Sequence, residues 1–533
     1  MIKRLQRAIG YRVFRQQQKK IIERIAQDVD AAFWKQQSDF SAEPVLMFNA
    51  STRIIGLSQN AAFELLTHWA LRMQGVPVVQ IVCAAAMHPC VLGTQPDHVD
   101  KRPPCEKCIR LSNDLYQHSA VRELVYLEAN CPGLDVLSME DMVSYKVGDF
   151  PAGEIVLPSL RWILRRHHLE DTPDVRILFQ RYIRTAVSLL GQFEQILDEV
   201  RPQSVVVFNG MFYPEATLKW AAQRRNLPVI SHEVALRPLT AYFTTGEATA
   251  YPIDLPKDYA LTTEQEARLD DYLANRMQGE FTMAGVRFWP EMKGLDEALI
   301  IKINQYKGVI PVFTNVIFDT SQGHANVLFE TMFDWLDSVA ELIRQHPDHL
   351  FIIRAHPDEI RPGKASRESV ADWVRNRHLL DLPNVVFIPP QEPFSSYELI
   401  QRAKFVMVYN STIGLEASIL GAAVICAGKA RFTQIDSVYF PPTQAEYHTL
   451  VESFIKQDKV QPPAKHRENA RKFLYAQLFE TSLPMDDYLE NDPYLNGYTA
   501  VKAITAAALD PQNARVMRII VDGITKGKPF LWQ

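Results

Sequence analysis

Small polar side chains interrupt an apolar segment in the second half of the chain, which reads FVMVYNSTIGLEASILGAAVICAG over residues 405–428. Asn410, Ser411 and Thr412 separate a short strand pattern from a helix pattern. Thr412 and Glu416 are four residues apart and therefore share one helix face. Free N–H groups at a helix start favour an anion, and a carboxylate one turn deeper suits a sugar hydroxyl. The segment predicts a site for a nucleotide sugar, although a well-capped helix between two strands explains the same spacing equally well.

Four of the six cysteines lie close together in the first half of the chain. Cys105 and Cys108 have C-x2-C spacing, which lets two thiolates bind one tetrahedral ion, and Cys83 and Cys90 complete a set of four ligands. His88 is an alternative fourth ligand. In a cytosolic protein this grouping favours a metal over disulfides. We predict a structural zinc site; thiols without metal and, with less support, an iron–sulfur cluster are the alternatives.

The elements that would position these residues follow two series of alternating strand and helix patterns. The first series comprises residues 45–49, 61–73, 76–83, 175–199, 204–208, 214–226 and 228–231. The second comprises residues 309–314, 325–345, 350–355, 385–388, 396–403 and the segment described above. Such alternation predicts a parallel, doubly wound sheet in each half. The predicted fold class is therefore α/β, with two doubly wound Rossmann-like domains facing a cleft, where ligands of such sheets bind.

The domain boundaries are predicted from breaks in these patterns, since 533 residues are long for one core. Residues 1–40 are expected to form a basic amphipathic helix, and residues 41–295 a first Rossmann-like domain that holds the cysteines. Residues 296–480 form the second Rossmann-like domain. Residues 481–533 are expected to be a helical tail that packs back across both domains.

Composition narrows the classes of function. The net charge of −5 gives no support for a nucleic-acid partner. No apolar run approaches the ~18–20 residues that span a bilayer, and no secretory signal is visible. We therefore expect a cytoplasmic protein.

The first 25 residues are basic and carry no acidic residue before Glu23. Apolar residues alternate with the basic ones in a helical pattern. Such a helix can lie on an anionic membrane surface, which would make the protein peripheral on the inner membrane. A solvated helix that packs on its own domain is the alternative.

Four passages resemble bacterial capsule and surface-polysaccharide glycosyltransferases of the GT-B fold. They are the strand ending in RAHP at 354–357, the turn NST at 410–412 with Glu416, the small-residue turn, strand and glycine of 422–428, and the segment 206–233. The resemblance covers about 300 residues, in pieces. It implies that the C-terminal domain binds a nucleotide sugar and that the N-terminal domain binds a glycan or lipid-linked glycan acceptor.

The resemblance also assigns roles to single residues. His356 would contact donor phosphate, Ser411 and Thr412 would hold phosphate at the helix start, and Glu416 would take ribose hydroxyls. The wider GT-B pattern has a second glutamate eight residues before Glu416, where this chain has Val408. This departure argues against a retaining mechanism of that type.

Glycosyl transfer needs relief of the charge on the leaving phosphate, and an inverting enzyme also needs a base. Arg354, His356 and Lys429 are expected to supply the positive charge, with Asn410 in the donor turn. No Asp-x-Asp follows a strand, so we expect no catalytic metal. We predict Glu233 as the base, with His232 second.

Four further residues follow strand patterns of the first half and are assigned to the acceptor side. They are Asn49, Ser51, Asn209 and Gly210. A plain strand-to-helix turn explains Asn209 and Gly210 equally well, because glycine permits positive φ and asparagine caps helices.

Other functions remain open at this point. A non-hydrolysing sugar-nucleotide epimerase shares the architecture, but it would need a glycine pair where Thr412 and Ile413 stand. A glycerophosphotransferase-like enzyme is a third possibility. A non-catalytic scaffold that only binds a sugar nucleotide belongs to a different class.

Overall fold

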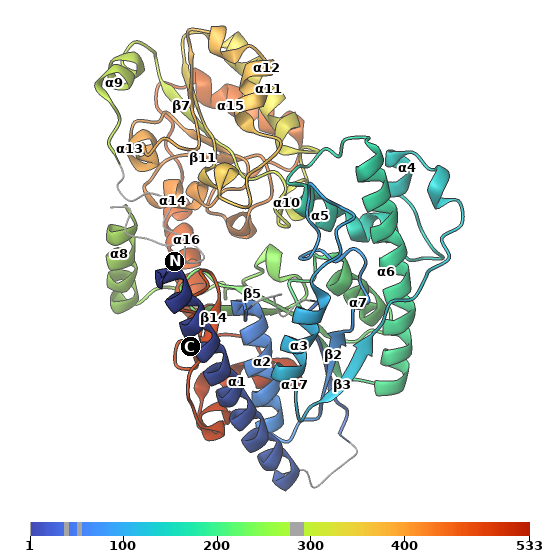
Figure 1. Cartoon of the computed structure of the whole chain (residues 1–533). Coiled ribbons are helices and arrows are strands. Elements are labelled where there is room, and N and C mark those ends of the chain that lie inside the picture. The colour runs from blue at the N-terminus through green and yellow to red at the C-terminus, as the bar shows by residue number, and fades with distance from the viewer. Residues whose placement is uncertain (1, 37–41, 51–55, 278–292, 533) are drawn as a thin grey trace. The chain divides into compact units, whose positions relative to one another are not determined.

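The structure is a computed structural model that describes residues 2–36, 42–50, 56–277 and 293–532. The chain folds into two compact units (Figure 1). The first unit comprises Met1–Ile163, Leu169–Thr249 and Leu478–Gln533, and the second comprises Leu164–His168 and Ala250–Gln477. The second unit is thus inserted into the sequence of the first.

The first unit is built on a seven-stranded sheet with the order β12-β6-β5-β4-β1-β2-β3. Its strands are β1 (Val45–Phe48), β2 (Val78–Cys83), β3 (Ala120–Leu124), β4 (Ser204–Phe208), β5 (Val229–Val234), β6 (Thr240–Thr245) and β12 (Leu483–Pro484). Neighbours from β3 to β5 are parallel, whereas β6 runs antiparallel to both of its neighbours, β5 and β12. The parallel part confirms the predicted doubly wound sheet, whose strands end at a common edge.

Helices cover both faces of this sheet, because consecutive strand residues point to opposite faces. Val45 and Met47 belong to the core beneath three helices, α1 (Ile2–Gln36), α2 (Gln59–Met73) and α17 (Arg515–Lys526). Phe48 points the other way, and its ring lies 5.2 Å from that of Phe193. Phe193 belongs to the second layer, α6 (Pro173–Val200) and α7 (Tyr213–Gln223) (Figure 1). The unit also contains α3 (Cys105–Leu115), α4 (Met139–Val143) and α5 (Ala152–Leu164).

The C-terminal segment corrects the predicted helical tail. It contributes β12 to the first sheet, a hairpin of β13 (Leu489–Asn491) and β14 (Thr499–Val501), and only then the helix α17. Leu483, Met485 and Val501 are fully buried in the core of the first unit. The tail therefore belongs to the first unit, because its apolar residues complete that core.

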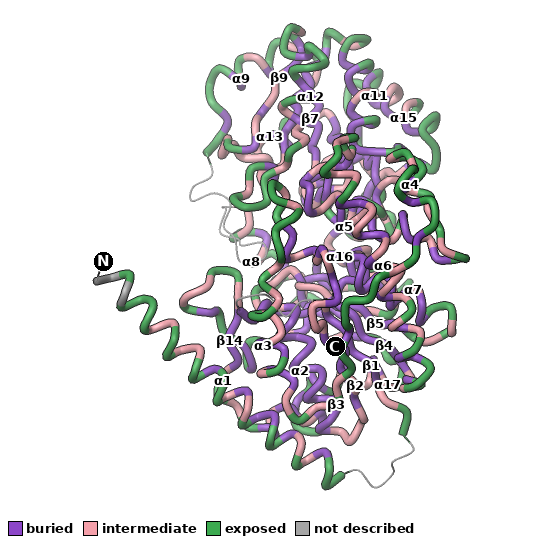
Figure 2. Tube along the Cα trace, turned by 45° about the vertical axis from the view of Figure 1, so that its right-hand side comes forward, coloured by how far each residue is buried: buried purple, intermediate pink, exposed green. Residues whose placement is uncertain are grey.

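Helix α1 is packed along its second half and exposed along its first. Ile25, Ala26 and Val29 are buried in the core, whereas Ile9 and Val13 are 54% and 48% exposed. Figure 2 shows this change along the helix from exposed to buried. In the part of the chain that the structure describes, no helix is long and apolar enough to cross a membrane.

The second unit is built on a five-stranded parallel sheet with the order β11-β10-β7-β8-β9. Its strands are β7 (Val309–Phe313), β8 (Leu350–Arg354), β9 (Val385–Ile388), β10 (Val406–Val408) and β11 (Val424–Cys426). Its helices are α8 (Thr263–Met277), α9 (Glu297–Ile303), α10 (Gln322–Ala325), α11 (Met332–Gln345), α12 (Val370–Asn376), α13 (Ser396–Gln401), α14 (Ile413–Ile419), α15 (Gln444–Lys456) and α16 (Ala464–Tyr475). This is the second doubly wound sheet that the sequence predicts.

Two predicted boundaries are wrong. The helix predicted from residue 325 starts only at Met332, because the Thr331 hydroxyl caps it by accepting a hydrogen bond from the Asp334 N–H over 3.2 Å. The boundary predicted at residue 295 lies near residue 250, since α8 belongs to the second unit, where Arg471 of α16 pairs with Asp270 of α8.

Candidate functional site

Polar residues follow three neighbouring strands at the carboxyl edge of the second sheet. Asn315 follows β7, Arg354 ends β8 and Asn410 follows β10. The side chain of Asn315 donates to Oδ1 of Asn410 over 2.7 Å, and the Thr314 hydroxyl donates to the carbonyl of Arg354 over 3.1 Å. The structure thus joins the loops of the predicted residues Arg354 and Asn410. It adds Asn315, whose signal in the sequence is a polar residue soon after a buried strand.

Arg354 carries a positive charge that is 5% exposed. Its Nη2 donates to the carbonyl of Glu392 over 2.7 Å. Its Nη1 is buried and has no hydrogen-bond partner among the described residues. Burial lowers the pKa of Arg354 to about 10, so the group remains charged at neutral pH. A guanidinium with unused N–H donors favours an oxyanion such as phosphate.

His356 begins the short turn Pro357–Ile360, which it caps: its Nδ1 accepts a hydrogen bond from the Asp358 N–H over 3.2 Å. Burial is the main cause that lowers the pKa of His356, although Asp358 and Asp319 act in the opposite direction. The ring is therefore neutral at pH 7, with its proton on Nε2. A capping role is visible, and the predicted contact with phosphate stays a prediction.

The turn before α14 has the predicted form. Ser411 is buried and Lys429, after β11, is exposed. The Thr412 side chain makes no capping hydrogen bond to α14. Gly414 allows the helix to pack closely, since a β-carbon there would lie 2.9 Å from the ring of Phe432.

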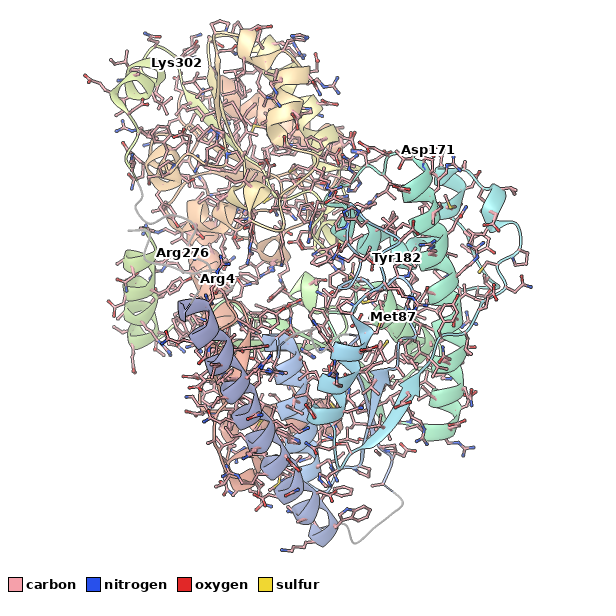
Figure 3. All side chains as sticks on the ribbon, viewed as in Figure 1. Arg4, Met87, Asp171, Tyr182, Arg276 and Lys302 are labelled. Carbon is pink, nitrogen blue, oxygen red and sulfur yellow. The ribbon has the colours of Figure 1, made fainter. Side chains whose placement is uncertain are left out.

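Glu416 is buried and both of its carboxylate oxygens are engaged. Arg276 of α8 donates to Oε1 from Nε over 2.8 Å and from Nη2 over 2.6 Å, and Tyr397 donates to Oε2 over 2.6 Å. Figure 3 labels Arg276 on its helix. Burial and then the Glu416 charge raise the pKa of Tyr397. The ribose contact predicted for Glu416 stays a prediction. No local pattern in the sequence indicates that Arg276 and Tyr397 bind this carboxylate.

Glu233 lies near the end of β5 and is held by three donors. Its Oε1 accepts hydrogen bonds from Asn60 over 3.0 Å and from the N–H of Val234 over 2.8 Å. Its Oε2 accepts from Asn209 over 2.7 Å. The side chain is only partly buried. The arrangement fixes one orientation of a carboxylate at the carboxyl edge of the first sheet, as a general base requires.

His232, the neighbour of Glu233, faces the interior because side chains alternate along a strand. It is fully buried, and its Nε2 lies 3.8 Å from a carboxylate oxygen of Glu64. Glu64 is also fully buried and accepts a hydrogen bond from Gln80 over 2.7 Å. A fully buried ring is not accessible to a substrate, whereas Glu233 is partly exposed. Glu233 is therefore the better placed of the two predicted bases.

The predicted acceptor-side residues lie on strands next to β5. Asn209 and Gly210 follow β4 with φ angles of 59° and 76°, a left-handed turn. Because Asn209 also donates to Glu233, it both shapes the turn and orients the carboxylate. Asn49 follows β1 and is 7% exposed. Ser51 lies outside the described residues.

The structure brings the four predicted cysteine ligands to one place. Cys83, Cys90, Cys105 and Cys108 line a common cavity and none forms a disulfide. Burial raises the pKa of Cys83 to about 11 and of Cys90 to about 12. Across the described ranges, no group of three or more His, Cys, Asp or Glu side chains is placed so that it could hold a metal ion.

Comparison with known proteins gives one family match and several structural likenesses. No curated protein matches the chain. The KpsC beta Kdo 2,4 transferase of Thermosulfurimonas dismutans is 13% identical, with a TM-score of 0.35 over 58% of this chain and 87% of that one. A UDP-GlcNAc 2-epimerase of Neisseria meningitidis, bound to UDP-GlcNAc, is 13% identical, with a TM-score of 0.24 over 81% and 98%. MurG of Acinetobacter baumannii is 11% identical, with a TM-score of 0.28 over 81% and 95%.

The family match lies in the second unit. Residues 296–435 match the family described as capsule polysaccharide biosynthesis protein. This segment includes Arg354, His356 and the turn at 410–412. For this part of the chain the predicted resemblance is confirmed: the segment that carries the polar edge of the second sheet is similar to capsule polysaccharide biosynthesis proteins.

Proposed function

We propose that the protein is a glycosyltransferase that moves a sugar from a nucleotide sugar to a surface polysaccharide or glycolipid acceptor. The observation that carries this proposal is the buried Arg354 guanidinium, which lies within the segment that matches the family. Its Nη1 has no hydrogen-bond partner in the described parts of the chain, and a phosphate would supply one. His356 follows β8, the strand that Arg354 ends, and the turn at 410–412 follows β10. These residues are therefore proposed to share the donor's phosphates.

The proposed reaction is an inverting transfer. The acceptor oxygen attacks the anomeric carbon and forms the new C–O bond, while the bond to the nucleotide's phosphate oxygen breaks and its electron pair leaves with the nucleotide. Glu233 accepts the proton of the acceptor hydroxyl. Arg354 and Lys429 offset the charge on the leaving phosphate, so the proposal includes no catalytic metal.

The acceptor is proposed to bind at the carboxyl edge of the first sheet. Asn49, Asn209 and Glu233 belong to the neighbouring strands β1, β4 and β5, or follow them directly. Amide groups suit the hydroxyls of a sugar, since they both donate and accept hydrogen bonds.

Contact with an anionic membrane surface is proposed for the exposed first half of α1. Arg4 and Arg12 are exposed there, together with Ile9 and Val13. Basic and apolar side chains in one exposed helix segment suit anionic headgroups. Sedimentation with phosphatidylglycerol vesicles tests this: binding should fall with salt and in Arg4→Glu/Arg12→Glu, and binding equal to that of uncharged vesicles contradicts it.

The donor proposal is tested by calorimetry with a panel of uridine, guanosine, thymidine and cytidine nucleotides and their sugar conjugates. One conjugate should bind the parent protein. Arg354→Gln should weaken that binding at least tenfold, because a charge-assisted bond contributes about 1.5–3 kcal/mol, and Arg354→Lys should weaken it less. The exposed Arg344, paired with Glu341 over 2.8 Å, is the matched control, and Arg344→Gln should bind as the parent does.

Two results would contradict the donor proposal. One is the absence of binding by every nucleotide and conjugate of the panel, which favours the scaffold function. The other is binding that Arg354→Gln leaves unchanged in a variant that unfolds as cooperatively as the parent, which places the donor elsewhere.

A further inference from the structure

Four thiols surround one small cavity of the first unit. The cysteine cluster consists of Cys83, Cys90, Cys105 and Cys108. Cys83 ends β2, Cys90 follows in the next loop, and the other two lie in the first turn of α3. The fold therefore assembles the cluster from three separate places in the sequence, beyond the local C-x2-C pair.

The size and the lining of the cavity suit a single soft metal ion. Its volume is about 20 Å³, and a cavity of roughly 10–15 Å³ already holds one water-sized particle. The remaining lining is Ala50, Ala85, Met87, Pro103, Pro104 and Ile109. Among the described residues that line the cavity there is no carboxylate or imidazole, so thiolates are the strong ligands at hand. A set of four thiolates selects zinc or an iron–sulfur cluster.

Backbone N–H groups around the cavity point at two of the sulfurs. The N–H of Gly93 donates to Sγ of Cys90 over 3.3 Å. The N–H groups of Ala86 and Met87 donate to Cys83 in the same way. Figure 3 labels Met87, which lies on the loop after β2. Donors of this kind orient metal ligands and stabilise the charge of a bound thiolate.

We propose that the cysteine cluster binds one zinc ion as a structural site. As the described side chains stand, no group of three His, Cys, Asp or Glu residues could hold a metal ion, so the proposal requires the thiols to turn toward the cavity when the ion binds. Each thiol loses its proton to solvent and each sulfur donates an electron pair to the ion. The proposal does not depend on the proposed glycosyl transfer.

The ion would fasten the loop that joins β2 to α3. The first part of this loop is anchored by the Tyr213 hydroxyl, which donates to the carbonyl of Pro89 over 2.8 Å, and by the Tyr182 hydroxyl of α6, which donates to Thr94 over 3.4 Å. Farther along, Asp100 pairs with Arg181 at the exposed surface over 2.7 Å, and exposed pairs contribute little. A metal held by both ends of the loop would fix its second part.

Fixing this loop has a consequence for an adjoining groove. The groove has a volume of about 820 Å³, and it shares Ala85, Pro103, Pro104 and Cys105 with the cavity. Arg102, Lys107 and Arg110 also line it. The zinc ion would therefore set the positions of three positive charges in the first unit.

Elemental analysis of the full-length protein, purified without chelator, tests the proposal. About one zinc per chain is expected. The double variant Cys105→Ser/Cys108→Ser should lose it, whereas Cys131→Ser, a buried cysteine outside the cluster, should keep it. The double variant should also melt at a lower temperature than the parent.

A second measurement keeps the test decisive if the double variant fails to fold. Parent protein stripped by chelator and reloaded with Co²⁺ should show a thiolate-to-cobalt charge-transfer band, which four sulfur ligands make intense. Failure to take up either zinc or cobalt, with six thiols titrated in the unfolded chain, would overturn the proposal. Iron with acid-labile sulfide in the purified protein would overturn the assignment to zinc.

Discussion

Glutamine at position 233 removes the proposed base and keeps the size of the side chain. In the parent, Oε1 accepts from Asn60 and from the N–H of Val234, and Oε2 accepts from Asn209 over 2.7 Å. The glutamine oxygen can retain the first two bonds, but its NH2 group then faces the donor of Asn209. The loss of one partly buried hydrogen bond costs about 1–3 kcal/mol. We therefore expect Glu233→Gln to fold, with a lower Tm.

The effect on catalysis should be much larger than the effect on stability. A general base contributes roughly 10²–10⁴-fold to a rate, so kcat should fall by such a factor at saturating donor. The donor Kd should stay at the parental value, because the donor is proposed to bind the second unit. Nucleotide release measures kcat and calorimetry measures Kd. The matched control is Glu199→Gln, an exposed carboxylate of α6 with 49% of its side chain accessible. A folded Glu233→Gln with parental kcat would refute the role of this base.

Three further substitutions test the second unit by urea unfolding. Gly414→Ala should lower the free energy of unfolding by about 1–3 kcal/mol, because its β-carbon would lie 2.9 Å from the Phe432 ring. The control is Gly191→Ala, which lies in open space within α6 and should not lower this free energy. Equal effects of the two substitutions would contradict the packing argument. Burial raises the pKa of Glu359 from 4.5 to about 8. The folded state then holds a proton that the unfolded state releases, so stability should fall as pH rises from 4.5 to 8; Glu359→Gln should flatten this fall, and an unchanged slope would contradict it. Arg276→Met leaves the carboxylate of Glu416 buried without its cation and should lower the free energy of unfolding by about 3–5 kcal/mol. A loss below about 1 kcal/mol, as for an exposed ion pair, would contradict the buried pair.

Much of the fold follows from local patterns. The strands and helices that carry Asn209, Asn410 and Glu416 were predicted within a few residues, since apolar runs, capping residues and glycines act over short distances. Ser395 is an example of such a capping residue, since its hydroxyl accepts a hydrogen bond from the Glu398 N–H at the start of α13 over 3.3 Å. The C-terminal tail could not be placed in this way, because β12 pairs with a strand about 240 residues earlier.

Several residues of the candidate site were named from the sequence, but the side chains that pair with them were not. Glu416 was identified from the helix start, yet Arg276 reaches it across 140 residues, and no local pattern reports such a pair. Glu233 was ranked before His232, but the sequence could not show which of the two is accessible. A strand places neighbours on opposite faces, and the pattern does not say which face is solvated. The spacing of Cys105 and Cys108 was a stronger signal, and the structure places all four predicted thiols around one cavity.

The most direct test of the proposed transfer is product analysis with the donor that calorimetry identifies. The protein is incubated with this nucleotide sugar and with polysaccharide or glycolipid acceptors, and released nucleotide and acceptor mass are followed together. We predict that the acceptor gains one sugar for each nucleotide released, and that Glu233→Gln slows both by the same factor. A sugar that is isomerised while still attached to its nucleotide, or donor that binds and is recovered unchanged with every acceptor, would contradict the assignment of the protein as a glycosyltransferase.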